Sequence, residues 1–230
     1  MISENLQILR DKFQLASEKA GRNPNEITLI AVSKTFSADL ILDAFRLGIF
    51  DFGENYAQEF VEKEKLLKDE KIIWHFIGHL QRNKVKYIAS KVSSIQSVDT
   101  IQLANEIDKQ AFQIQKKIDV LIEVNTSLEA TKYGVAPEKS LELIAQVGVL
   151  KNLNVKGLMT IGPFVEDEKL TRKSFTTLRE IKDRVNTEKI LSTEIKELSM
   201  GMTHDFEIAI DEGATIIRIG TAIFGSRLKK

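Results

Sequence analysis

The sequence has 230 residues, which is enough to bury one sizeable core and near the lower end of the range for a closed α/β barrel. Its 33 basic and 33 acidic residues give a formal net charge of zero, whereas duplex-binding proteins usually carry a basic excess, so we expect no nucleic-acid partner. The absence of Cys excludes disulfides, thiolate metal sites and a Cys nucleophile, and is compatible with a reducing compartment.

The first segment, residues 1–21, predicts an amphipathic helix. Its apolar residues recur at helical spacing: Ile2, Leu6, Leu9, Phe13 and Ala16. Ser3 is the expected N-cap and Gly21 the expected C-terminal stop. Charges throughout the segment exclude a signal peptide, and no apolar run approaches the roughly 18 residues that span a membrane. We therefore expect a cytoplasmic protein with no membrane partner.

From residue 27 onward, strand-like runs alternate with helix-like runs. The expected strands are 27–34, 50–54, 72–78, 92–98, 118–125, 155–162, 197–200 and 215–220. The expected helices are 38–47, 56–68, 83–89, 100–115, 137–147, 168–185 and about 205–211, with Pro137 at a first helical position. Such alternation indicates a parallel sheet with helices outside it.

The repeated units predict an α/β fold, a single (β/α)8 TIM barrel domain over residues 1–230, preceded by the N-terminal helix. An open doubly wound sheet is the alternative. It would normally carry a Gly-rich turn after its first strand, where this chain reads SKTFSAD, so the barrel is favoured.

The first expected strand ends in Lys34. Functional sites of such barrels lie at the carboxyl ends of the strands. Because side chains alternate along a strand, Lys34 shares a face with Ile30 and Val32. If that face points inward, desolvation favours the neutral amine, the form that condenses with an aldehyde. A solvated lysine or a salt-bridge partner is the alternative.

The last two strands predict a phosphate site. Arg218 shares the face of Ile216, Gly220 allows close backbone approach, and Thr221 offers a hydroxyl and an N–H. The preceding loop, 199–203, is small and rich in donors, and barrels frequently bind phosphate at these two loops. A glycine turn beside a surface arginine is the alternative. A lysine near a phosphate site suggests a phosphorylated aldehyde, either pyridoxal 5′-phosphate (PLP) or a phosphosugar.

Three further loops hold candidates. Asn55 follows the second strand, with helix capping as the alternative to ligand contact. Lys132 could place a second cation at the rim, with a solvated lysine as the alternative. The histidines have no metal-ligand spacing, so no metal is expected: His75, His79 and His204. A histidine inside an apolar run, such as His75, is more often a hydrogen-bonded core residue than a ligand.

Five motifs together resemble one family, the pyridoxal phosphate homeostasis proteins of the YggS/PROSC type. The motifs are AVSKT (31–35), GENYAQE (53–59), WHFIGHLQRNK (74–84), LSMGMTHDFEIAI (198–210) and RIGTAIFG (218–225). They occur in order from about residue 27 to 226, and the third and fourth are long and specific. The resemblance implies an alanine-racemase-type barrel without the racemases' second, β-rich domain.

The resemblance also implies roles for single residues. It gives Lys34 as the residue that carries PLP as an aldimine and Arg218 as the arginine that faces the pyridine nitrogen. It assigns the phosphate-binding segments to Ser199, Met200, Thr203, Gly220 and Thr221, and it places Asn55 along the ring. Two departures are minor: Thr203 stands where serine is common, and Phe36 where a polar or basic residue is common.

These features favour a carrier over an enzyme. An arginine against the pyridine nitrogen keeps it unprotonated, which weakens the ring as an electron sink. The resembled racemases use a tyrosine base from outside the barrel, whereas the three tyrosines here, Tyr56, Tyr87 and Tyr133, all precede the sixth strand. We expect a PLP carrier in vitamin B6 and amino-acid homeostasis without strong catalytic activity, with apo forms of PLP enzymes as transient partners. The alternatives are a low-efficiency PLP-dependent amino-acid racemase and a phosphosugar lyase with a lysine Schiff base.

Overall fold

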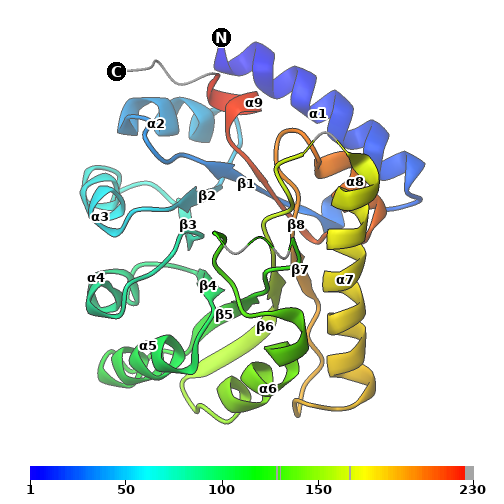
Figure 1. Ribbon diagram of the computed structural model, residues 1–230. Helices are drawn as coiled ribbons and strands as arrows, with labels where there is room; N and C mark the ends of the chain where they lie inside the picture. The colour runs from blue at the N-terminus through cyan, green and yellow to red at the C-terminus, as the bar shows by residue number, and fades with distance from the viewer. Residues whose placement is uncertain (128, 130, 166, 226–230) are drawn as a thin grey trace.

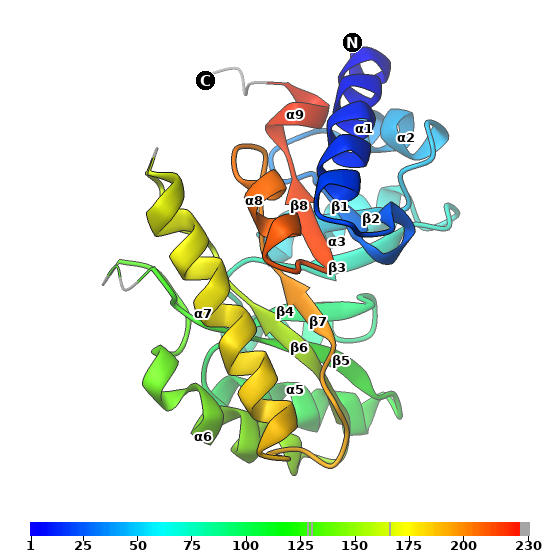
Figure 2. The same cartoon turned by 90° about the vertical axis from the view of Figure 1, so that its right-hand side faces the viewer.

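The computed structural model describes residues 1–127, 129, 131–165 and 167–225. Within these ranges eight parallel strands pair in chain order and close into a barrel, which the helices surround (Figures 1 and 2). The expected (β/α)8 barrel with a preceding helix is confirmed.

The elements agree with the expected ones in order and differ at their ends. The strands are β1 (Thr28–Val32), β2 (Asp51–Glu54), β3 (Ile73–Phe76), β4 (Ser94–Val98), β5 (Ile118–Glu123), β6 (Leu153–Met159), β7 (Glu197–Ser199) and β8 (Ile216–Ile219). The α-helices are α1 (Ile2–Lys19), α2 (Ala38–Arg46), α3 (Ala57–Leu66), α4 (Val85–Ile88), α5 (Ile101–Gln113), α6 (Pro137–Gly148), α7 (Glu168–Thr187), α8 (Phe206–Asp211) and α9 (Thr221–Phe224). Short 3₁₀ turns, η1 (Pro24–Glu26) and η2 (Arg82–Lys84), precede β1 and α4.

Helix α1 begins two residues earlier than the sequence indicated. Met1 is the N-cap and Ser3 lies inside the helix, so the expectation of Ser3 as the cap is wrong. The α-amino group of Met1 donates to Glu4 Oε2 at 2.9 Å, which stabilises the first turn without a serine cap. Gly21 follows the helix with φ +66°, a conformation that favours glycine, as expected of a stop. Figure 2 shows α1 beside α9, and Asn5 Nδ2 donates to the carbonyl of Ile223 at 2.9 Å.

The barrel interior is layered. Ile30, Leu121, Met159 and Ile216 form an apolar cluster inside the barrel, separate from the main core between the strands and the helices. The inward alternation expected along the first and last strands is therefore confirmed for these side chains.

A polar layer lies toward the amino ends of the strands. His75 Nδ1 lies 2.7 Å from Ser94 Oγ, and His75 Nε2 lies 2.9 Å from Asp51 Oδ1. His75 is buried, so it is a hydrogen-bonded core residue, as its apolar surroundings in the sequence suggested. Across the described ranges, no three His, Asp or Glu side chains gather into a possible metal site. No described helix combines the length and apolar character needed to cross a membrane.

Candidate functional site

Lys34 lies in a tight turn directly after β1. The amide of Phe36 donates to the carbonyl of Ser33 at 3.1 Å and closes the turn, so the strand ends at Val32, two residues earlier than expected. Lys34 is half-buried at the carboxyl end of the barrel. This is the end at which barrels of this type hold their functional groups.

The start of α9 lies beside this turn because β8 pairs with β1. Ala31 is in register with Ile219, and a Cβ added to Gly220 would lie 3.5 Å from both Cβ and O of Val32. Phe36 stacks on Phe224 of α9, with ring centroids 4.8 Å apart. Phe36 therefore joins the β1 turn to the last helix.

Two threonines meet above β7 and β8. Thr221 Oγ1 donates to Thr203 Oγ1 at 3.1 Å, and the amide of Ala222 donates to the same oxygen at 3.4 Å. In the part of the chain that the structure describes, the amides of Thr203, His204 and Thr221 have no hydrogen-bond partner. Hydroxyls and unengaged amides gathered at one point suit an anion such as phosphate.

Arg218 points into the barrel from β8 and is buried. Its Nη1 donates to Ser199 Oγ at 2.6 Å and its Nη2 to the carbonyl of Thr160 at 2.7 Å. Ser199 Oγ in turn donates to Gln96 Oε1 at 2.6 Å. Burial lowers the pKa of Arg218 to about 10, against the attraction of nearby carboxylates, so the guanidinium stays charged at neutral pH.

The structure places Ser199 and Met200 below the mouth. The Ser199 hydroxyl is engaged with Arg218 inside the barrel. The Met200 side chain packs in the core outside the strands, and its amide donates to the carbonyl of Ile216 at 3.1 Å. Gly201 then turns the chain with φ +92°, where a Cβ would lie 2.5 Å from that of Ala209. These residues shape the loop that presents Thr203.

Asn55 carries a buried oxygen that nothing satisfies among the described residues. Its Oδ1 has no hydrogen-bond partner there. Tyr56 is the N-cap of α3 and makes no side-chain capping bond, so the capping alternative for Asn55 is wrong. A Cβ on Gly78 would lie 2.3 Å from the Asn55 carbonyl, so the β3 loop needs glycine to pack here. A buried acceptor of this kind calls for a donor from a ligand or water.

The loops after β3 and β5 meet across the rim. The rings of His79 and Tyr133 stack with centroids 3.8 Å apart, and His79 Nδ1 lies 3.8 Å from Asp99 Oδ2. Lys132 Nζ donates to the carbonyl of Gly162 at 2.8 Å, which ties the β5 loop to the segment after β6. Lys132 therefore lies at the rim with its ammonium group engaged. The stacking of His79 on Tyr133 was not predicted from the sequence.

Glu123 is the last residue of β5 and lies inside the mouth of the barrel. Its titration near neutral pH was not predicted from the sequence. Its side chain is 4% exposed. Burial raises the pKa of Glu123 from its usual 4.5 to about 7; Asp99 acts in the same direction and Arg218 opposes it. The carboxyl group thus changes charge near neutral pH.

We expect the stability of the apo-protein to depend on this group between about pH 4.5 and 7. The folded state binds the proton more tightly than the unfolded chain, so the stabilisation is complete below the unfolded pKa and is lost as the pH rises through 7. The change is on the order of 3 kcal/mol. Urea unfolding of wild type and of Glu123→Gln at several pH values measures the contribution of Glu123 to the free energy of unfolding. Parallel pH profiles of the two proteins would contradict the assignment.

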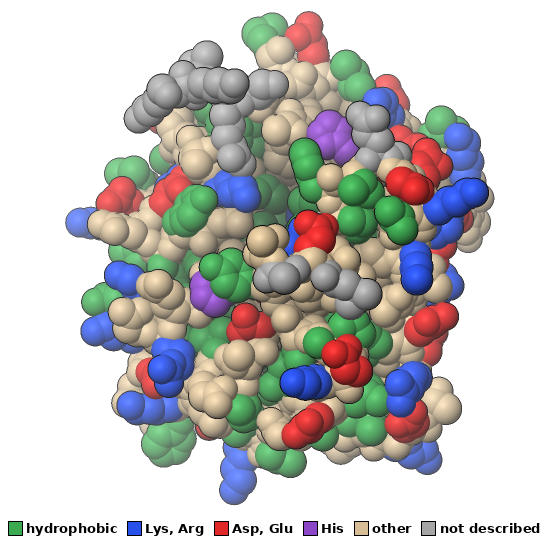
Figure 3. Space-filling model, viewed as in Figure 1, with side chains coloured by type: hydrophobic (Ala, Val, Ile, Leu, Met, Phe, Trp, Pro, Cys, Tyr) green, Lys and Arg blue, Asp and Glu red, His purple; other side chains and the backbone are tan. Residues whose placement is uncertain are grey.

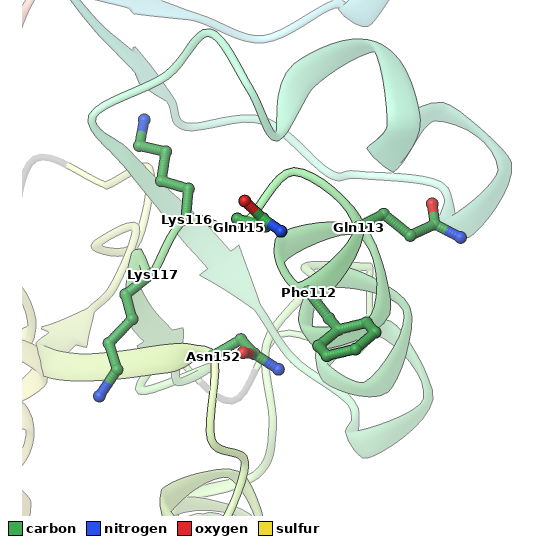
Figure 4. Close-up of a pocket in the computed structure, with 6 residues that line it drawn as sticks. All are labelled: Phe112, Gln113, Gln115, Lys116, Lys117 and Asn152. Carbon is green, nitrogen blue, oxygen red and sulfur yellow. The ribbon is translucent and has the colours of Figure 1, made fainter.

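Surface grooves also lie outside this cluster. One, of about 470 Å³, lies beside the mouth between the start of α7 and the β7–α8 loop, with Phe164, Met202 and His204 in its lining. Figure 3 shows hydrophobic side chains gathered beside a histidine on this side of the molecule. Another, of about 420 Å³, is lined by residues such as Phe112 and Lys117 (Figure 4). Its residues directly precede β5 and β6, so this groove lies at the opposite end of the barrel from Lys34.

The chain is similar to known proteins over almost its whole length. Residues 5–228 match the family model of the alanine racemase N-terminal domain. A pyridoxal phosphate homeostasis protein of Aquifex aeolicus is 47% identical, with 97% of each chain covered. The crystal structure of an unknown protein from Bifidobacterium adolescentis is 36% identical at a TM-score of 0.91, and the match covers 97% of this chain and 94% of that one. The structure of Synechococcus elongatus PipY with PLP bound is 31% identical at a TM-score of 0.84, covering 98% of this chain and 100% of that one.

Proposed function

Because the chain belongs to the family of pyridoxal phosphate homeostasis proteins, we propose that it binds PLP at the carboxyl ends of its strands and carries it covalently on Lys34. One observation carries the proposal: Lys34, the unengaged amides of Thr203 and Thr221, and the buried, unpartnered Asn55 Oδ1 belong to the same end of the barrel. The family resemblance read from the motifs is confirmed by the comparisons.

The residues present fit PLP in charge and in chemistry. Thr203 and Thr221 offer hydroxyls and amides for the phosphate, and Gly220 keeps the space beside Val32 open. Asn55 lines the ring with an acceptor that needs a donor. When bound, PLP supplies an aldehyde that condenses with amines and an electron-withdrawing ring.

Ser199 and Met200 act indirectly in this proposal. Ser199 accepts from Arg218 and orients its guanidinium toward the pyridine nitrogen. Met200 supports the turn that presents Thr203, through its side chain in the outer core. Both residues therefore position groups that contact the cofactor.

We assign the protein to PLP homeostasis without strong catalytic activity. A charged Arg218 donates a hydrogen bond to a neutral ring nitrogen and repels a protonated one, which keeps the ring a weak electron sink. On this proposal residues 1–230 form one PLP-binding domain that acts in the cytoplasm and delivers PLP to apo forms of PLP enzymes, with neither nucleic acid nor a membrane as a partner.

A low-efficiency amino-acid racemase is the second candidate, favoured by the acid–base side chains His79 and Tyr133 stacked at the rim. Exchange of the α-proton of alanine and other amino acids for deuterium by the PLP-loaded protein distinguishes the two. The carrier proposal expects exchange far below roughly one event per second, the lower range of ordinary turnover.

The covalent attachment is tested on the freshly purified protein. We expect a visible absorption band that borohydride abolishes, with the pyridoxyl group then mapped to the peptide that contains Lys34. A label on Lys132 alone would refute the assignment of Lys34. A purified protein without a visible absorption band would favour the alternative of a phosphosugar lyase with a lysine Schiff base.

The phosphate assignment predicts graded losses of affinity. Thr221→Ala removes one hydroxyl and should weaken PLP binding about tenfold to a hundredfold, the equivalent of one hydrogen bond to a charged group. Gly220→Leu should weaken PLP binding more, because its side chain would fill the open space beside Val32 where we place the phosphate. Titration of the apo-proteins with PLP measures both. Wild-type affinity in Gly220→Leu would place the phosphate elsewhere.

A further inference from the structure

The turn that contains Lys34 has an unusual backbone conformation. It runs from Ser33 to Phe36, and its third residue, Thr35, has φ +69°. Lys34 is not among the described residues with positive φ, so the turn has the φ signature of type II rather than type I′. Glycine or asparagine normally occupies that third position, and a β-branched threonine is disfavoured there. Some other contact must hold this conformation.

Glu59 of α3 makes that contact. Its Oε1 accepts the amide of Thr35 at 2.5 Å. Type I and type II turns differ by a flip of their central peptide, whose N–H here belongs to Thr35. A carboxylate fixed on one side of that peptide therefore selects the type II orientation.

A buried lysine fixes the carboxylate. Lys63 Nζ lies 2.6 Å from Glu59 Oε1 and 2.7 Å from Glu54 Oε1, and it donates to the carbonyl of Ser33 at 2.7 Å. Ser33 Oγ also donates to Glu54 Oε1, at 2.6 Å. The backbone is thus held on both sides of Lys34, at residue 33 and at residue 35, by one network from β2 and α3.

We propose that Glu59, held by Lys63, is a positioning residue that fixes the central peptide of the Ser33–Phe36 turn and thereby the backbone conformation from which Lys34 reaches PLP. The inference rests on the proposed function, since it concerns the attachment of PLP to Lys34. A flip of that peptide would change ψ of Lys34 and turn the Thr35 amide to the opposite side of the turn, so the backbone that carries the amine would no longer be held in its present conformation.

The test compares Glu59→Ala with Glu64→Ala. Both glutamates lie on α3 and form an ion pair with a lysine, and their side chains are 25% and 22% exposed. We expect Glu59→Ala to raise the Kd for PLP by about tenfold to a hundredfold, as for one lost hydrogen bond to a charged group, and Glu64→Ala to stay within about twofold. Glu59→Gln, which keeps an acceptor oxygen, should fall between them.

Two further measurements separate positioning from simple loss of stability. Hydrogen exchange at the Thr35 amide in the apo-protein should speed up in Glu59→Ala and not in Glu64→Ala. Thr35→Gly, introduced into Glu59→Ala, should restore part of the PLP affinity, because glycine adopts positive φ without strain. General destabilisation would predict neither the localised exchange nor the recovery of affinity.

The outcomes are distinct. Equal Kd values for Glu59→Ala and Glu64→Ala overturn the proposal, and so does a raised Kd that Thr35→Gly leaves unchanged. If wild type carries no pyridoxyl group on Lys34 after borohydride, the proposed function fails instead. Hydrogen exchange of the Thr35 amide is measured on the apo-protein and does not depend on PLP. If this exchange is unchanged in Glu59→Ala, Glu59 does not fix the turn.

Discussion

Lys34→Ala should abolish the covalent attachment of PLP while the barrel remains folded. The variant lacks the only amine that the proposal places between the phosphate site and the β1 turn. Residual binding through the threonine amides and hydroxyls should remain, but with the absorption band of the free aldehyde in place of that of the lysine adduct, and without any pyridoxyl group on the protein after borohydride reduction. Absorption spectra and mass spectrometry of the reduced protein measure both effects.

The matched control is Lys132→Ala. Lys132 lies at the rim and donates to the carbonyl of Gly162, so its loss should leave the label on Lys34 intact. Thermal unfolding of the apo-proteins checks that each variant is folded. Stoichiometric labelling of Lys34→Ala at another lysine would show that the cofactor is held elsewhere.

Local patterns were sufficient to predict the barrel and the inward direction of Arg218. Alternation with a period of two fixes which side chains of a strand share a face, and Ile30, Ile216 and Arg218 followed it. The positions of the element ends were less certain. Met1 took the place expected for Ser3, and its amino group donates to the carboxylate of Glu4 in the first turn.

Contacts between distant segments could not be predicted in this way. Gln96 and Ser199 are 103 positions apart in sequence, and they meet only because β4 and β7 face each other across a closed barrel. A glutamine within the buried run of β4 was the available signal, and it did not identify the partner. The same holds for Glu59, which lies in a recognised motif, although nothing in the local sequence shows that it reaches the Thr35 amide.

The pairing of Thr203 with Thr221 was partly predictable. Both were singled out because loops after the seventh and eighth strands of such barrels often bind phosphate. The short helix α9 that brings the Ala222 amide to Thr203 was not expected, because a four-residue helix leaves little periodic signal. General rules for the barrel fold therefore predicted where the site lies, whereas its hydrogen bonds could be identified only from the three-dimensional structure.

Replacing Arg218 should have the other large effect. Arg218 is buried beside Glu123 and Asp205, whose charges favour its protonated form. Arg218→Glu would place another carboxylate among these two. The substitution also removes the donors to Ser199 Oγ and to the carbonyl of Thr160, and an uncompensated buried charge costs on the order of several kcal/mol. That is a large part of a typical stability of about 5–15 kcal/mol, so Arg218→Glu should be marginally stable at neutral pH.

Arg218→Gln separates chemistry from stability, since it is neutral and can still donate to Ser199. Without the guanidinium, protonation of the ring nitrogen is no longer opposed, and the ring becomes a better electron sink. The PLP-loaded variant should therefore show a shifted visible band and faster α-proton exchange with amino acids than wild type. The expectation fails if a fully loaded Arg218→Gln keeps the wild-type spectrum, because Arg218 would then lie away from the ring. It also fails if wild type itself exchanges the α-proton at roughly one event per second or more, since the arginine would then not suppress the reaction.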